Sequence, residues 1–312
     1  MKNAFIFPGQ GAQYPGMGKD FVEGYDIAKK TLEEADDILG RKLSDIIMNG
    51  PVDSLTETKN SQTGIYVISI AILRVVNDLF PDLKPQLCAG LSLGEYTAAT
   101  AAGYLPFTDG LPLVQYRGQY MNEACEISKG TMAVVLGLDA DVVEDIIHEV
   151  NLPNDLWAAN FNCPGQVVIS GTIEGINAGS KAAKDRGAKR VLPLQVHGAF
   201  HSGLMTPAKE KLSSHVLETH FNSNHSDLIM NVTGGIVSEQ SMIRKNLIEQ
   251  VTSPVKWEKG MRCMEEEGVG LFIEMGPGKT LSGFNKRIGV SAKTVSIEKV
   301  EDLRSLEETL NN

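Results

Sequence analysis

The chain has 312 residues, of which 42% are hydrophobic and 22% are charged. This composition is that of an ordinary globular protein, so disordered and fibrous classes are excluded. The length fits two compact units, or one core with an inserted lobe. Lys and Arg number 29 against 39 Asp and Glu, so the formal net charge is −10. The chain lacks an overall basic field, and neither nucleic acid nor a membrane is expected as a partner.

Neither secretion nor membrane insertion is indicated by the apolar segments. The run near the N-terminus covers residues 4–7, which is too short for a signal peptide. The most apolar stretch, residues 64–73, stops at Arg74 and is too short to cross a bilayer. The cysteines are scattered without a CxxC pair: Cys88, Cys125, Cys163 and Cys263. Because this spacing indicates neither a zinc site nor a disulfide framework, we expect a protein of the reducing cytoplasm.

Strand-like and helix-like segments alternate along most of the chain, which predicts an α/β protein with a largely parallel sheet. The expected elements of the first part are a strand at 3–7, a Gly- and Gln-rich loop at 8–18, helices at 27–39 and 61–80, a strand at 86–89, and a helix at 107–125. Between the last two, residues 90–94 lead directly from the strand into an Ala-rich helix.

The pattern changes between residues 131 and 193. Here we expect strands at 131–136, 157–162, 166–170 and 190–194, and helices at 141–150 and 174–186. The resulting order, βαββαβ, is that of a ferredoxin-like unit. We therefore predict a small lobe, residues 129–195, inserted into a larger α/β unit formed by residues 1–128 and 196–312. In the last part of the chain, strands are expected at 227–232 and 271–275 among helices.

The strongest local motif is Gly-Leu-Ser-Leu-Gly at residues 90–94, which fits the G-x-S-x-G nucleophile elbow. The glycines permit a strained turn, so that the Ser92 hydroxyl lies at the start of a helix. There the main-chain N–H of Leu93 can stabilise an oxyanion. The alternative is a purely structural Ser-Gly turn, but the flanking strand and helix favour a nucleophile.

A serine nucleophile needs a base, which is normally histidine. His197 and His201 flank an apolar, Gly-containing loop, where a polar side chain is hard to explain as surface. Their spacing could also hold a metal, but Gly198 weakens a helical reading and no HExxH glutamate is present. The candidate base lies in mid-chain, so the order of ordinary α/β hydrolases is not met.

Arg117 lies on an apolar helix stripe with Leu113, Val114 and Met121. A guanidinium there must either reach out to solvent or meet an anion. From the residues alone, reaching out to solvent is the favoured interpretation.

Six motifs in this order resemble those of the malonyl-CoA:acyl carrier protein transacylases, an acyltransferase family of type II fatty acid synthesis. They are FPGQGAQ at 7–13, GLSLGEY at 90–96, QYRG at 115–118, NFNCPGQ at 160–166, GAFHS at 198–202 and EMGPG at 274–278. The resemblance covers essentially the whole chain. It implies a hydrolase-like α/β core with a ferredoxin-like small subdomain, which agrees with the predicted elements.

The resemblance also implies the catalytic residues. Ser92 is then the acylated nucleophile and His201 its base. Gln250 matches the glutamine whose main-chain carbonyl orients that histidine in place of an acid. Gln10 and Leu93 supply the N–H groups of the oxyanion hole.

The implied substrate contacts come from other segments. Arg117 pairs with the malonyl carboxylate, and Phe200 narrows the acyl pocket. Asn160 and Asn162 line the cleft. Met121, on the same helix face as Arg117, is counted with the substrate-binding residues. One position departs from the family: Leu91 stands where a histidine usually precedes the serine, which leaves the tuning of the elbow open.

The implied reaction transfers malonyl from malonyl-CoA to holo acyl carrier protein through a malonyl-serine intermediate, with no metal or other cofactor. A serine thioesterase or esterase and a non-catalytic carrier-protein-binding module are the alternatives. Carrier proteins are generally acidic, so docking needs a local basic surface, and we expect a monomer. The densest basic group is Lys181, Lys184, Arg186, Lys189 and Arg190, to which Lys286 and Arg287 could contribute.

Overall fold

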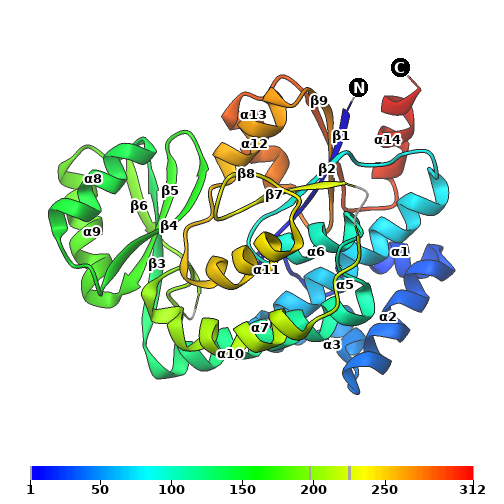
Figure 1. Cartoon of the computed structure of the whole chain (residues 1–312), viewed down its shortest axis with the longest axis horizontal. Helices are drawn as coiled ribbons and strands as arrows, with labels where there is room; N and C mark the ends of the chain where they lie inside the picture. The colour runs from blue at the N-terminus through cyan, green and yellow to red at the C-terminus, as the bar shows by residue number, and fades with distance from the viewer. Residues whose placement is uncertain (1, 197, 224–225, 312) are drawn as a thin grey trace.

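A computed structural model describes residues 2–196, 198–223 and 226–311. The chain forms a large α/β unit and a smaller one beside it, which carries β3 to β6 (Figure 1). The large unit is built on a six-stranded sheet in the order β10-β9-β1-β2-β7-β8. Its strands are β1 (Lys2–Phe7), β2 (Leu87–Gly90), β7 (Asp227–Met230), β8 (Gly235–Val237), β9 (Val269–Met275) and β10 (Lys293–Ile297). All neighbours pair parallel except β7 and β8, so the predicted parallel sheet is confirmed.

Helices cover both faces of this sheet (Figure 1). They are α1 (Lys19–Gly24), α2 (Asp26–Leu39), α3 (Leu43–Asn49), α4 (Val52–Thr56), α5 (Thr58–Leu79), α6 (Gly94–Ala101), α7 (Phe107–Ile127), α10 (Thr206–Glu218), α11 (Gln240–Glu249), α12 (Trp257–Glu266), α13 (Thr280–Ile288) and α14 (Asp302–Leu310). Two short 3₁₀ turns, Gly203–Met205 and Gln250–Thr252, lie in the last part of the chain.

The central strand β1 shows how the layers pack. Phe5 and Phe7 enter the apolar cluster that contains α5 and α7, whereas Ala4 and Ile6 enter the cluster of α12 and α13. A strand buried on both faces reads as an uninterrupted apolar run, as the sequence here does. Helix α5 is long and apolar enough to cross a membrane, but 78% of its most apolar window is buried in this core.

The small unit consists of β3 (Gly130–Leu136), α8 (Ala140–Val150), β4 (Leu156–Cys163), β5 (Gln166–Thr172), α9 (Ile173–Asp185) and β6 (Arg190–Pro193). Its strand order, β4-β5-β3-β6 with every pair antiparallel, is that of the predicted ferredoxin-like unit. One face packs on α8 and α9 through its own apolar cluster. Met132, Val134 and Val168 on the other face join the core of the large unit. The predicted boundaries, 129 and 195, enclose these elements, and a division of the chain at those positions stays a prediction.

The sequence expectations for the last third were incomplete. Two strands were expected after the small unit, but the structure has four there, with β8 and β10 in addition to β7 and β9. Both additional strands lie at the edges of the large sheet. Both are short and only partly buried, and neither contains a long run of apolar residues that would mark it in the sequence.

Candidate active site

The predicted elbow forms between β2 and α6. Ser92 has a φ of 52°, the left-handed conformation that non-glycine residues seldom adopt. A Cβ on Gly90 would lie 1.9 Å from the main chain of Gly94, and one on Gly94 would lie 2.2 Å from the carbonyl oxygen of Phe7. Both glycines are therefore required by close packing around the serine.

Ser92 and His201 meet although 109 positions separate them. Ser92 Oγ lies 2.8 Å from His201 Nε2, and His201 Nδ1 lies 2.8 Å from the main-chain oxygen of Gln250. Because a carbonyl oxygen only accepts, Nδ1 carries the proton and Nε2 is left as the acceptor for the serine hydroxyl. His197, the second candidate base, lies outside the described residues.

Burial keeps this histidine neutral. Only 3% of His201 is exposed. Desolvation, followed by the positive charge of Arg117, lowers its pKa to about 4. At neutral pH His201 is therefore unprotonated and able to take a proton from Ser92.

Arg117 does not reach solvent, so the interpretation favoured from the residues alone was wrong. It is 1% exposed. Its guanidinium donates to Gln62 Oε1 at 2.6 Å, Gln250 Oε1 at 2.8 Å and Ser92 Oγ at 3.0 Å. Nε has no partner among the described residues. A buried cation that is bonded only to neutral oxygens is suited to an anionic ligand.

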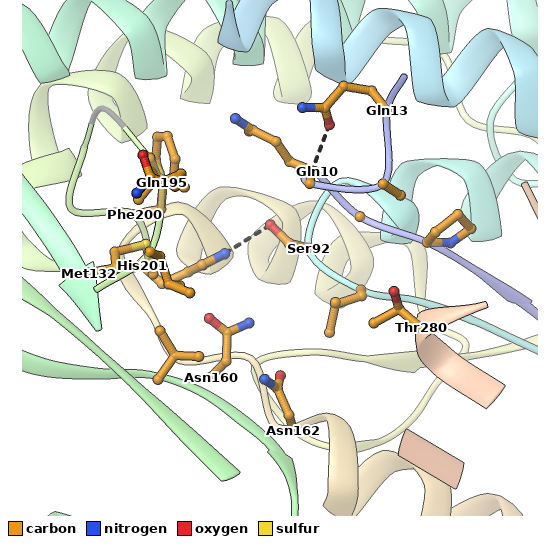
Figure 2. A pocket seen from close by; sticks show the side chains of 18 of the residues that line it. Gln10, Gln13, Ser92, Met132, Asn160, Asn162, Gln195, Phe200, His201 and Thr280 are labelled. Atoms are coloured by element: carbon orange, nitrogen blue, oxygen red, sulfur yellow. Dashed lines mark hydrogen bonds between the residues drawn. The ribbon is translucent and has the colours of Figure 1, made fainter. Parts of the chain in front are cut away.

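A cavity of about 320 Å³ opens beside Ser92. In Figure 2 His201 points at Ser92, with Gln10 on one side of the serine and Asn160 and Asn162 on the other. Phe200, Met121 and Met132 also line this cavity. Asn162 Oδ1 is buried without a partner among the described residues, so it can accept a hydrogen bond from a ligand.

Of the two predicted oxyanion donors, one lines the cavity and the other directly follows Ser92 in the chain. Gln10 is one of its lining residues, and Leu93 immediately precedes the first turn of α6. Within the described residues, neither main-chain N–H is taken by another group. Leu91 lines the cavity too and packs with the apolar cluster of α12 and α13.

Sequence reasoning missed a polar network behind the elbow. Asn231 Oδ1 accepts from the main-chain N–H of Ser92 at 2.7 Å, and its Nδ2 donates to Gly90 at 2.8 Å. Glu95 is fully buried and accepts from the main-chain N–H of Asn231 and from Gln250 Nε2. Burial raises the pKa of Glu95, whereas the hydrogen bonds from Asn231 and Gln250 and the charge of Arg117 lower it. The sequence signal that could have indicated this network is an acidic residue, Glu95, directly after the elbow.

The predicted docking residues lie on the outside of the small unit, and all five are exposed. Two are already paired with acids: Lys181 with Asp185 at 2.9 Å and Arg186 with Glu149 at 2.8 Å. On the large unit, Arg287 donates to Gln166 Oε1 at 2.7 Å. Gln166 and Arg190 are the strand partners of Leu136 on its two sides, so the contact between Arg287 and Gln166 lies two strands away from Arg190 in the same sheet.

The acyl transferase domain family matches residues 4–300, and the chain therefore belongs to this family. The malonyl CoA-acyl carrier protein transacylase of Bacillus subtilis (strain 168) is 42% identical over 99% of this chain and 97% of its own length. That of Haemophilus influenzae is 37% identical over 99% of both chains.

Solved structures agree with these relatives. An acyl carrier protein S-malonyltransferase from Vibrio cholerae O1 superposes with a TM-score of 0.93 at 37% identity, covering 98% of this chain and 100% of the other. A malonyl-transacylase solved in complex with a type II PKS acyl-carrier protein gives a TM-score of 0.95 at 36% identity, with full coverage of both chains. The recognised family and the expected fold class are confirmed.

Proposed function

We propose that this chain transfers the malonyl group of malonyl-CoA to the phosphopantetheine thiol of acyl carrier protein through a malonyl ester of Ser92. The observation that carries the proposal is the buried guanidinium of Arg117, 3.0 Å from Ser92 Oγ. In a malonyl thioester the carboxylate is two bonds from the carbonyl carbon that reacts. A cation this close to the nucleophile therefore selects an acyl group with a terminal carboxylate.

The first half-reaction acylates the serine. Ser92 Oγ attacks the thioester carbonyl while its proton passes to His201 Nε2. The main-chain N–H groups of Gln10 and Leu93 stabilise the oxyanion. The carbon–sulfur bond then breaks, and His201 returns the proton to the departing CoA thiolate.

The second half-reaction reverses these roles. The thiol of the carrier protein gives its proton to His201, its sulfur attacks the ester carbonyl, and Ser92 leaves with the proton. Every step uses bonds of the substrates and side chains of one chain, so the proposal needs no cofactor and no second subunit. The setting is the cytoplasm, in agreement with the four free cysteines.

For carrier-protein docking we favour Lys189 and Arg190 within the basic group. Lys189 and Arg190 have no salt bridge in the part of the chain that the structure describes, whereas Lys181 and Arg186 do. Arg190 is the strand partner of Leu136, which on its other side pairs with Gln166. Gln166 accepts a hydrogen bond from Arg287 on α13, and Thr280 and Phe284 of this helix line the cavity. An acidic carrier protein seated there would have the cavity entrance within reach of its phosphopantetheine arm.

Intact mass spectrometry after mixing with malonyl-CoA tests the proposal. We expect a malonyl adduct that is stable in buffer and disappears when holo carrier protein is added. Loss of the adduct in buffer alone would instead indicate a thioesterase, and absence of any adduct would favour a non-catalytic binding module.

A further inference from the structure

A buried carboxylate lies behind the catalytic residues, and no step of the proposed reaction uses it. Glu95 is fully buried in the first turn of α6, three positions after the nucleophile. One oxygen accepts from the main-chain N–H of Asn231, and the other accepts from Gln250 Nε2 at 2.7 Å. Both partners are donors, so neither could accept a proton from a neutral carboxyl. These hydrogen bonds favour the charged carboxylate and oppose the effect of burial on its pKa.

The carboxylate of Glu95, together with the main-chain oxygen of Ser92, determines which way the side-chain amide of Gln250 is turned. An amide has a donor end and an acceptor end. Nε2 of Gln250 is held between two acceptors, Glu95 Oε2 and the main-chain oxygen of Ser92 at 2.8 Å. The acceptor end, Oε1, is thereby turned to Arg117, whose Nη2 lies 2.8 Å away.

Arg117 depends on this orientation. Turning the amide of Gln250 over would place an NH₂ group against the guanidinium, donor against donor, in a buried site. The charge of Glu95 also acts on Arg117 through space, because it favours the cationic form that burial disfavours. Glu95 itself touches neither the cavity nor the guanidinium.

We propose that Glu95 is a positioning residue for malonyl recognition: it orients Gln250 so that Arg117 stays charged and fixed beside Ser92. The inference rests on the proposed function, because it assigns Glu95 to the selection of the acyl carboxylate. The competing explanation is structural, since Glu95 also ties α6 to the end of β7 through Asn231.

The chain offers a matched control in Glu274. This glutamate is also fully buried, and its carboxylate accepts from the main-chain N–H groups of Leu281 and Ser282 at the start of α13. It has no contact with Gln250 or Arg117. Glu274→Gln therefore measures the effect of losing a buried helix-tying carboxylate.

The experiment compares acylation of Ser92 by malonyl-CoA and by acetyl-CoA, followed by intact mass, in wild type, Glu95→Gln and Glu274→Gln. Thermal midpoints are recorded for all three. We expect both variants to be less stable, but only Glu95→Gln to lower the malonyl-to-acetyl ratio, by about tenfold or more. An unchanged ratio in folded Glu95→Gln, or an equal fall in Glu274→Gln, would overturn the inference.

A second variant covers the case that Glu95→Gln does not fold. It is the double variant Glu95→Gln with Gln250→Glu. This variant keeps one buried carboxylate but places it against Arg117. The main-chain carbonyl of residue 250, which binds His201, stays in place. We expect the ratio to stay low, because the guanidinium is then neutralised by the protein. Recovery of the wild-type ratio would show that the position of the charge is irrelevant and would overturn the inference. A wild-type ratio near one, in contrast, would contradict the proposed function itself.

Discussion

The cavity beside Ser92 and the basic surface of the small unit use charge in opposite ways. Beside Ser92, at the edge of the cavity lining, one buried guanidinium is fixed by three neutral oxygens. On the surface five exposed cations share their neighbourhood with acids, and two of them are paired. A charge without solvent around it interacts strongly over short distances, whereas an exposed one is screened by water and salt. Single changes should therefore be decisive in the cavity and graded on the surface.

The largest effect is expected for Ser92→Ala. Removing Oγ removes the nucleophile that takes the acyl group from malonyl-CoA, so no malonyl adduct should form. The fold should persist, as a thermal midpoint close to wild type would show. Wild-type kinetics should give parallel double-reciprocal lines, the ping-pong pattern. Intersecting lines, or an adduct on the variant, would contradict a Ser92 intermediate.

Arg117→Ala should come next. Malonyl transfer should fall by about two orders of magnitude or more, on the order of 3 kcal/mol. Acylation by acetyl-CoA should hold or rise, because the stranded charge is gone. Arg117→Lys separates charge from geometry, since lysine keeps the charge but lacks the planar fork. If the malonyl-to-acetyl ratio of Arg117→Ala matched wild type, the selection would have to reside elsewhere.

The pH dependence of the acylation rate should show that His201, the proposed base, is buried. The depressed pKa of His201, about 4, keeps the imidazole neutral until the medium is well below pH 6. The rate of Ser92 acylation by acetyl-CoA, which does not use the carboxylate contact of Arg117, should therefore stay flat from about pH 8 to about pH 5.5 and fall as the pH approaches 4. A half-maximal rate near pH 6.5, the value of an exposed histidine, would mean that His201 is solvated.

On the surface, reversing the charges of Lys189 and Arg190 to glutamate should slow transfer to carrier protein by about tenfold at low salt and less at high salt. Acylation by malonyl-CoA should not change. Lys181→Glu is the control, because Lys181 is also exposed but already paired with Asp185. Equal slowing by the control, or slowing of both half-reactions, would rule out this docking surface.

The smallest effect is expected for Leu91→His, which restores the usual residue of the family. Leu91 lines the cavity, but the Ser92–His201 and His201–Gln250 contacts are complete without it. The acylation rate should change by less than about threefold. A large gain would instead show that the present chain is a weakened member of its family.

The sequence predicted the parts of the fold that have a regular pattern. Three predicted features are found as expected: the alternation of strands and helices, the elbow at 90–94 and the βαββαβ order. Each has a periodic apolar pattern or is bounded by glycines. The edge strands β8 and β10 were missed because they are short and half-exposed, so no apolar run marks them.

In the site, the family resemblance named Ser92, His201 and Gln250, and the structure brings them into contact. The apolar stripe around Arg117 was misread because Gln62 and Gln250, which hold its guanidinium, come from other segments of the chain. Glu95 and Asn231 were missed for the same reason, because their partners also come from distant segments of the chain. Their roles depend on contacts over 136 positions or more, which no local pattern records.

Residue 250 divides its work between two kinds of atom. Its peptide carbonyl holds the histidine, and its side chain holds the arginine. No amino-acid substitution removes a peptide carbonyl. Replacing the side chain at this position would therefore test the contact with Arg117 and substrate choice, but it would not test the contact with His201. The same property makes this partner of His201 hard to remove by point mutation. Inherited change at residue 250 can alter which acyl group is accepted while the proton transfer survives.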